Sequence, residues 1–317
     1  MGNGSGPFGP EGQASGAHLR VQPNIARVYD ALLGGKDSFV ADRDLAARLV
    51  EVQPLIVAGA RANRAFLCRA VGFLARQGIS QFLDLGCGLP TARNVHQIAG
   101  RVNPAARTVY LDNDPIVLAY ARALLAYARA LLADGDRTTV ADGDLRDPKA
   151  ILADPGVRGH LDFTRPVAVI MAAVLHFITD QEDPAGIVAA FRDVMAPGSA
   201  LVITHVVDGD ADDGNGNGNA DSDGDGNADG HNVSAATRKS AQLYSETTSP
   251  FTLRTHEQVA AWFDGMRLLP PGLVNAGAWR RTGNRKTTAP ILAGVGLLDP
   301  QARRPESRPP GSGAPQP

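Results

Sequence analysis

Aromatic residues make up only 5% of this chain of 317 residues, and it has two cysteines, Cys68 and Cys87. Two thiols cannot build a disulfide framework, so we expect a reducing compartment, the cytoplasm. No run of about 18 apolar residues occurs, and we expect no membrane-spanning helix. The opening MGNGSGPFGPEGQASGAHLR lacks the apolar core of a secretion signal, and Gly6 breaks the myristoylation pattern.

Basic residues are missing from one segment. From Asp208 to Gly230 there are eight aspartates and no lysine or arginine; without these aspartates the formal charge changes from −2 to +6. The arginines elsewhere are scattered, so we expect no nucleic-acid partner. Part of the segment imitates a calcium loop, but its twelfth position is Asn232 where such loops have a bidentate glutamate. We therefore expect a flexible acidic linker and no metal.

Short apolar runs that alternate with helical patterns fill the rest of the chain, and a hydrophobic content of 44% suffices for a core. The patterns predict helices at 24–33, 41–52, 57–76, 91–101, 114–133, 148–153, 184–195, 234–243 and 255–264, and strands at 81–85, 107–112, 137–141, 166–172, 199–205, 266–274 and 289–297. Strands rich in Val, Ile and Leu with helices between them predict an α/β fold, a doubly wound parallel sheet covered on both faces.

Composition also predicts the domain organisation. The predicted parts are a disordered 1–17, an N-terminal helical cap at 18–80, a Rossmann-like domain at 81–298 with a disordered acidic insert at 207–232, and a disordered tail at 299–317.

A glycine turn follows the first predicted strand in QFLDLGCGLPT, residues 81–91. Gly86 and Gly88 follow an apolar strand, as in dinucleotide-binding turns. Pro90, however, lacks the backbone N–H that a pyrophosphate needs, and Thr91 occupies the place of the third small residue. We therefore expect a ligand without phosphates, and we expect Thr91 to cap the next helix.

Three aspartates, Asp84, Asp112 and Asp144, stand at or just after the ends of three consecutive predicted strands. The carboxyl ends of parallel strands meet at one edge, so these side chains should face one crevice. A carboxylate in the second position can accept two hydrogen bonds from ribose hydroxyls, and we expect this of Asp112. The competing role of helix cap suits Asp114, which precedes Pro115. Asp144 is either a ligand or a turn cap. Carboxylates without a phosphate cradle favour S-adenosylmethionine over a nicotinamide dinucleotide.

Several segments in this order resemble a known family. QFLDLGCGLPTARNVH, VYLDNDPIVLAYARALL, DGDLRDP and RPVAVIMAAVLHFI resemble the S-adenosylmethionine-dependent methyltransferases common in actinobacteria, long catalogued as a family of unknown function. PNIARVYDALLGGKDSFVADRDLA, RANRAFLCRAVGFL and WFDGMRLLPPGLV are similar too, and the resemblance covers 20–297 without the insert. It implies a class I methyltransferase sheet of strand order 3-2-1-4-5-7-6, with strand 7 antiparallel and an N-terminal helical extension.

The resemblance also implies cofactor-binding residues. These are Asp84, Gly86 and Gly88 for the methionine part, Asp112 and Asn113 for the ribose, and Asp144 and Leu145 for the adenine.

The N-terminal YDALLGGKDSF motif resembles a lid over the cofactor cleft in that family. Its candidate pocket residues are Tyr29, Gly34, Gly35, Lys36 and Asp37. Two glycines between helices also suit a capped helix hairpin that packs on the core, so that alternative stays open.

His176 follows the predicted strand 166–172, where similar methyltransferases place a residue facing the transferred methyl. A histidine there could take the acceptor's proton near neutral pH, although a structural role is the alternative. His205, after the next strand, is a weaker candidate. No Ser-His-Asp order, zinc spacing or phosphate-loop lysine stands out.

These observations predict a cytoplasmic methyltransferase that uses S-adenosylmethionine on an unidentified small-molecule acceptor, without a membrane partner. A regulatory protein that binds the cofactor without turnover is the first alternative, because no catalytic base is compelling. A nicotinamide-dependent oxidoreductase is less favoured because of Pro90 and Thr91.

Overall fold

The computed structural model describes residues 22–91, 93–132, 137–208, 228–247, 249–281 and 289–299. The predicted disordered start, most of the acidic insert, and nearly all of the tail lie outside these residues. Residues 228–232, the end of the predicted disordered insert and of its calcium-like loop, instead begin the helix Ala228–Tyr244. No helix in the described ranges is long and apolar enough to cross a membrane.

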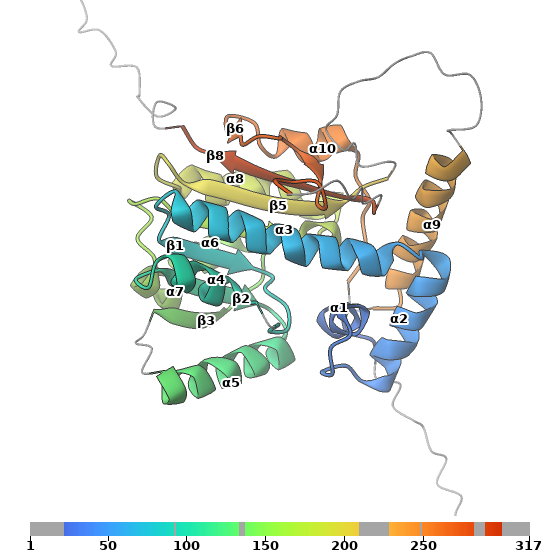
Figure 1. The fold of residues 1–317 in the computed structure, drawn as a ribbon, viewed down its shortest axis with the longest axis horizontal. Helices are drawn as coiled ribbons and strands as arrows, with labels where there is room; N and C mark the ends of the chain where they lie inside the picture. Colours follow the sequence, from blue (N-terminus) through green and yellow to red (C-terminus); the bar gives the residue numbers. More distant parts are fainter. Residues whose placement is uncertain are drawn as a thin grey trace, which may run out of the picture.

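A sheet of eight strands forms the centre of the described structure (Figure 1). Its strands are β1 (Gln81–Leu85), β2 (Arg107–Asp112), β3 (Thr138–Asp142), β4 (Ala168–Ala172), β5 (Ala200–Val206), β6 (Arg267–Leu268), β7 (Val274–Asn275) and β8 (Ile291–Leu297). The order is β3-β2-β1-β4-β5-β8-β6, and β7 also pairs with β8. Strands β1 to β5 are parallel and β8 is antiparallel to β5. The predicted sheet is confirmed, with β8 as its seventh strand.

The predicted strand 266–274 is instead two short strands, β6 and β7. Pro270 and Pro271 lie between them, and neither has an N–H to donate to a ladder. The segment still runs beside β8, because the Leu269 N–H donates to the Val295 carbonyl at 2.8 Å.

Helices cover both faces of the sheet. They are α1 (Ile25–Leu33), α2 (Val40–Val52), α3 (Ile56–Arg76), α4 (Val95–Val102), α5 (Pro115–Leu132), α6 (Pro148–Ala153), α7 (Pro155–His160), α8 (Pro184–Val194), α9 (Ala228–Tyr244) and α10 (His256–Ala261), with short 3-10 helices η1 (Leu175–Phe177) and η2 (Asp180–Glu182). Side chains alternate along the strands, so Phe82 packs with α3 and α4 while Leu83 packs with α6, α7, α8 and α10. Figure 1 shows α3 running across one face.

A third apolar cluster lies beyond the carboxyl ends of the parallel strands, where α1, α2 and α9 gather (Figure 1). Val28, Leu45, Leu49 and Tyr244 form its centre. The cluster covers the edge of the sheet where the predicted ligand-binding residues lie. We call this cover the roof.

The start of α4 corrects one expectation. The helix begins at Val95, with Asn94 as its N-cap, and the Asn94 N–H donates to the side chain of Gln97 at 3.0 Å. The Thr91 N–H donates to Asn94 Oδ1 at 2.9 Å, so the prediction of Thr91 as the cap was wrong. An Asn-x-x-Gln capping box outcompetes the earlier threonine. Asp114 does cap α5 as predicted, because Oδ1 accepts from the Ile116 N–H at 2.7 Å.

Candidate functional site

A cavity of about 640 Å³ opens at the carboxyl ends of the parallel strands, under the roof formed by α1 and α9. It lies where strand order reverses, since the chain leaves β1 for β2 on one side and later enters β4 on the other. The predicted residues that line it are Tyr29, Gly86, Gly88, Asp112, Asn113, Asp144, Leu145 and His176. Residues from distant parts of the sequence therefore meet at one site.

The glycine turn forms one wall because its backbone bends back over β2. Gly86 and Gly88 have positive φ of 67° and 63°, which favours glycine. A Cβ on Gly86 would also lie 2.4 Å from the Val174 side chain. The N–H groups of Gly86 and Cys87 both donate to the Leu111 carbonyl, at 2.8 and 3.1 Å. The turn is thus held against the end of β2, next to Asp112.

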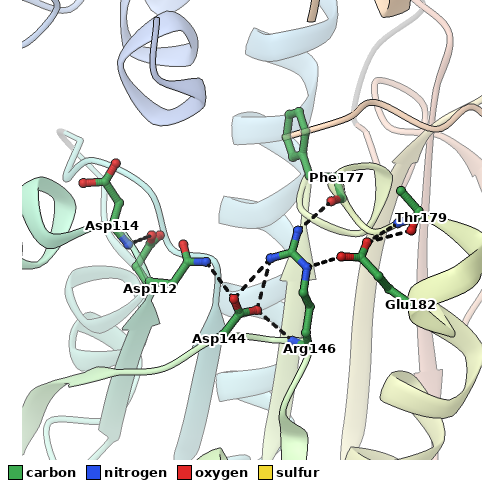
Figure 2. Close-up of polar contacts among 8 residues, drawn as sticks. Asp112, Asp114, Asp144, Arg146, Phe177, Thr179 and Glu182 are labelled. Carbon is green, nitrogen blue, oxygen red and sulfur yellow. Dashed lines mark hydrogen bonds and ion pairs between the residues drawn. The ribbon is translucent and has the colours of Figure 1, made fainter. Parts of the chain in front are cut away.

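The Asp112 carboxylate is oriented by backbone donors on both oxygens. Oδ2 accepts from the Gly88 N–H and Oδ1 from the Asp114 N–H, each at 3.0 Å; Figure 2 shows the second bond. Burial raises the pKa of Asp112, and these two N–H groups oppose the shift. Each oxygen keeps a further lone pair, so the group can still accept from two ligand hydroxyls.

Asp144 lies in a polar network that joins the β3 end to η1 and η2 (Figure 2). Arg146 Nη1 donates to both Asp144 oxygens at 3.2 Å, and Asn113 Nδ2 donates to Oδ2 at 3.2 Å. Arg146 Nε donates to Glu182 at 2.5 Å, and Nη2 reaches the Phe177 carbonyl at 3.4 Å. The Asp144 side chain is still 42% exposed, so it can accept from a ligand amino group.

Asp84 does not line the main cavity. It is 5% exposed and borders a smaller space shared with Arg64, Cys87 and Gly88. Burial raises the pKa of Asp84 to about 7; the positive charge of Arg64 lowers it and the charge of Asp112 raises it. A contact between Asp84 and the methionine part of the cofactor stays a prediction.

Arg64, on α3, is a functional candidate that sequence reasoning missed. It lines both the main cavity and the smaller space beside Asp84. Its Nη2 donates to Thr91 Oγ1 and to the Arg93 carbonyl, which holds the guanidinium at the glycine turn. The RANRAFL stretch gave no signal that singles out this residue, because α3 also contains Arg61, Arg69 and Arg76.

The N-terminal motif contributes to the cavity through α1. The Tyr29 hydroxyl donates to the Ala60 carbonyl at 3.1 Å and accepts from Asn63 Nδ2 at 2.9 Å. Asn24 Nδ2 donates to Asp114, which ties the start of α1 to the start of α5. Tyr29, Asn24 and Asp114 all line the cavity.

Gly34, Gly35, Lys36 and Asp37 are not among the lining residues. They enclose Asp30, which does line the cavity: the Asp37 N–H donates to Asp30 Oδ2 at 2.9 Å. A Cβ on Gly35 would lie 1.9 Å from Asp30 Oδ1, so only glycine permits this approach. The loop holds a carboxylate at the cavity wall, and a ligand contact by the four loop residues themselves stays a prediction.

His176 sits on η1 and is 3% exposed. No group in the described ranges hydrogen-bonds to its Nδ1. Burial, and next the charges of His205 and Arg254, keep the pKa of His176 well below its usual value. The ring is therefore a neutral imidazole and a weak proton acceptor.

His205 has a structural role behind His176. Arg254 Nη1 donates to His205 Nε2 at 3.1 Å, so the ring proton is on Nδ1 and is donated to the Val206 carbonyl at 2.6 Å. Burial, then Arg254, lowers the pKa of His205 to about 3.

The charge of the cavity is mostly negative. The charged side chains that line it are Asp30, Arg64, Asp112, Asp114, Asp144 and Arg146. Four carboxylates against two guanidinium groups suit a cationic ligand that bears ribose hydroxyls. The positive φ of the glycine turn, the oriented Asp112 and the exposed Asp144 together fit S-adenosylmethionine. Within the described ranges no cluster of His, Cys, Asp or Glu could hold a metal ion.

Comparison with known proteins agrees with this geometry. Residues 17–299 match the family model described as S-adenosyl methyltransferase. The crystal structure of a protein from Thermobifida fusca YX, assigned as a methyltransferase, is 38% identical, with a TM-score of 0.74 over 88% of this chain and 96% of that one. The crystal structure of a DUF574 family protein from Streptomyces avermitilis MA-4680 is 32% identical, with a TM-score of 0.75 over 87% and 97%. No curated protein matches this chain.

The family match covers most of the chain, and the two similar crystal structures, at 38% and 32% identity, also cover most of it. The chain therefore belongs to the S-adenosyl methyltransferase family and is an S-adenosylmethionine-dependent methyltransferase with a class I fold.

Proposed function

We propose that this enzyme transfers a methyl group from S-adenosylmethionine to a small-molecule acceptor bound in the same cavity. The observation that carries the proposal is the continuity of the cavity, which extends from Asp112 and Asp144 past His176 to α9. A protein that only binds the cofactor needs only the part of the cavity next to Asp112 and Asp144. The further space beside His176 and α9 can hold an acceptor, and it therefore favours an enzyme over a regulatory binding protein.

The cofactor half lies over β1, β2 and β3. Asp112 accepts from the ribose hydroxyls with Asn113 beside it, and Asp144 accepts from the adenine amino group above Leu145. The turn at Gly86 and Gly88 receives the methionine part.

Two further residues complete this half. Arg64, which lies at the turn and also faces Asp84, binds the carboxylate of the methionine part. Asp30 adds negative charge to the cavity wall.

When bound, S-adenosylmethionine supplies a methyl on a positively charged sulfur, which leaves as the neutral thioether of S-adenosylhomocysteine. The protein's part is chiefly to hold the acceptor in line with that methyl. The acceptor half, defined by His176 and Phe177 of η1, Thr237, Ser240 and Tyr244 of α9, and Phe251, lies beyond β4 and β5. His176 contacts the acceptor and positions it as a neutral hydrogen-bonding group.

Cofactor binding is tested by calorimetry on the Asp112→Ala variant. Loss of charge-assisted bonds to the ribose should weaken S-adenosylmethionine binding by about 1.5–3 kcal/mol. Asp142→Ala is the matched control, because Asp142 ends the neighbouring strand but is exposed and does not line the cavity. Equal affinities in Asp112→Ala and the wild type would refute the ribose assignment.

Turnover is tested by measuring S-adenosylhomocysteine formed with a library of acceptors. His176→Ala should lose turnover while retaining cofactor affinity, and the wild-type rate should show no titration of His176 between pH 5 and 8. Cofactor binding without turnover for every acceptor would favour the regulatory alternative.

We also propose a cytoplasmic location, which the two free thiols support, and an actinobacterial origin, which the two similar structures support.

A further inference from the structure

The acceptor half of the cavity differs in chemistry from the cofactor half. None of the six charged side chains that line the described cavity belongs to η1, α9 or the segment around Phe251. They come from α1, α3, the end of β2, and the loops that follow β2 and β3. An acceptor with a full charge would lose its hydration on entering this half and find no side chain of opposite charge there. Burial of such an unpaired charge costs free energy. An uncharged acceptor avoids that cost.

Aromatic rings form most of this half. Tyr244 and Phe251 are stacked, with centroids 4.7 Å apart and planes at 18°. Phe177 meets Phe251 edge-on at 5.3 Å and Tyr244 at 5.8 Å. His176 extends the group, at 4.5 Å from Phe177 and 4.7 Å from Phe251. In a chain with only 5% aromatic residues, this concentration around one cavity is a local feature of the site.

The polar groups of this half are neutral and mostly engaged with each other. Ser240 Oγ donates to the Thr237 carbonyl at 2.7 Å, and Gln53 Nε2 donates to Thr237 Oγ1 at 2.9 Å. His176 differs, because its side chain is buried at the wall and Nδ1 has no hydrogen-bond partner in the described ranges. A neutral imidazole has one donor and one acceptor, so the unpartnered Nδ1 keeps capacity for one polar contact, which a ligand reaches once the ring turns this enclosed atom toward the cavity.

We infer that the acceptor half is a subsite for a flat, uncharged aromatic molecule with a polar substituent, an inference that rests on the proposed methyl transfer. The rings of Phe177, Tyr244 and Phe251 provide faces and edges against which an aromatic ring packs better than a saturated ring of equal size. His176 receives the polar substituent and so fixes the orientation of the ring. The total volume of about 640 Å³ lies within the range of about 300–1,000 Å³ that is typical of ligand pockets.

The test is calorimetric binding to the full chain saturated with S-adenosylhomocysteine. The probes are uncharged aromatic alcohols of one to three rings, each compared with its saturated counterpart and its carboxylate. For two rings these are 2-naphthol, decahydro-2-naphthol and 2-naphthoate. We expect at least one aromatic alcohol to bind about tenfold tighter than both counterparts, equivalent to about 1.4 kcal/mol.

The Phe251→Leu variant removes one ring and keeps an apolar side chain. In this variant the aromatic probe should bind no more than about threefold tighter than its saturated and carboxylate counterparts. Phe177→Leu, which removes a different ring, should have the same effect. Tyr120→Leu is the control, since Tyr120 is exposed on α5 and does not line the cavity. Unchanged affinity for S-adenosylhomocysteine verifies that each variant is folded.

The outcomes separate this inference from the function on which it rests. If S-adenosylhomocysteine binds but saturated or charged probes bind as tightly as every aromatic one, or no probe binds, the aromatic subsite is overturned. A preference that survives in both leucine variants also overturns it. If S-adenosylhomocysteine itself does not bind the wild type, the proposed function fails instead.

Discussion

At the scale of single residues, burial at the end of β1 disfavours the charged form of Asp84. Asp84 is nearly fully buried next to Arg64 and close to Asp112, and burial is the largest cause of its pKa near 7. The carboxyl is thus close to half-protonated at neutral pH in the folded protein. In the unfolded chain it titrates near 3.8. The folded state therefore holds more protons than the unfolded state between about pH 4 and pH 7.

This difference predicts a pH dependence of stability. Because the native state binds the extra proton, the contribution of Asp84 is most favourable below about pH 4 and is lost as the pH rises toward 7. Asp84→Asn should therefore stabilise the fold, relative to wild type, by an amount that grows by about 1–3 kcal/mol from pH 4.5 to pH 8. Urea unfolding at several pH values measures the growth, and comparison of the two proteins cancels the other titrating groups. A difference that stays constant with pH would contradict the assignment.

At the scale of elements, the junction between α1 and α2 is built around one carboxylate. Gly34 ends α1 with a positive φ of 82°, and the following backbone passes so close to Asp30 that position 35 has no room for a Cβ. The loop and the end of the helix thus constrain each other. A buried ion pair also connects the two helices, with Arg27 Nε of α1 lying 2.7 Å from Asp42 Oδ2 of α2.

Gly35→Ala should lower the free energy of unfolding by about 1–3 kcal/mol, because the methyl group would overlap the Asp30 carboxylate. If that overlap is the cause, Asp30→Ala should relieve it. The double variant should then cost less than the sum of the single variants by about 0.5–3 kcal/mol.

Gly100→Ala is the control for this cycle. Gly100 lies inside α4 with open space at its Cβ position, so alanine should stabilise the helix there by about 0.5–1 kcal/mol. Urea unfolding reports all four variants. Additive costs for Asp30→Ala and Gly35→Ala would show that the two positions do not interact.

At the scale of the whole molecule, the cavity joins two layers that are far apart in sequence. Its floor is the strand-end edge of the sheet, and its roof is the cluster of α1, α2 and α9. Arg146 links the cofactor side to η1 and η2 across this floor. A ligand that fills the cavity should therefore stabilise floor and roof together.

S-adenosylhomocysteine at about 100 times its Kd should stabilise the protein by about 2.7 kcal/mol. Hydrogen exchange should slow in α1, since Tyr29 and Asn24 line the cavity, as well as in the glycine turn. Amides of α7 are the internal reference, because no α7 residue lines the cavity and the helix ends beside Arg107 at the start of β2. Protection confined to residues 81–91 and 112–114 would mean that the roof does not take part in cofactor binding.

The pattern of residues by itself predicted the sheet and the cofactor, and the resemblance to a methyltransferase family implied the strand order. Short apolar strands have a local pattern, and the turn at Gly86 and Gly88 is read from neighbouring residues. Asp112 and Asp144 follow from the rule that ligand groups gather at strand ends. The exact ends of the elements were harder to predict. Asn94 caps α4 in place of Thr91, and two prolines divide the predicted strand 266–274 into β6 and β7.

Only the tertiary structure decided which residues complete the site. Within the N-terminal motif the predicted Gly34 to Asp37 do not line the cavity, whereas Asp30 does, because the loop folds back over its carboxylate. Arg64 reaches the glycine turn from α3, and the aromatic wall brings together η1, α9 and the segment around Phe251. These contacts join residues far apart in the chain, and no periodicity or spacing in the sequence encodes which distant side chains meet.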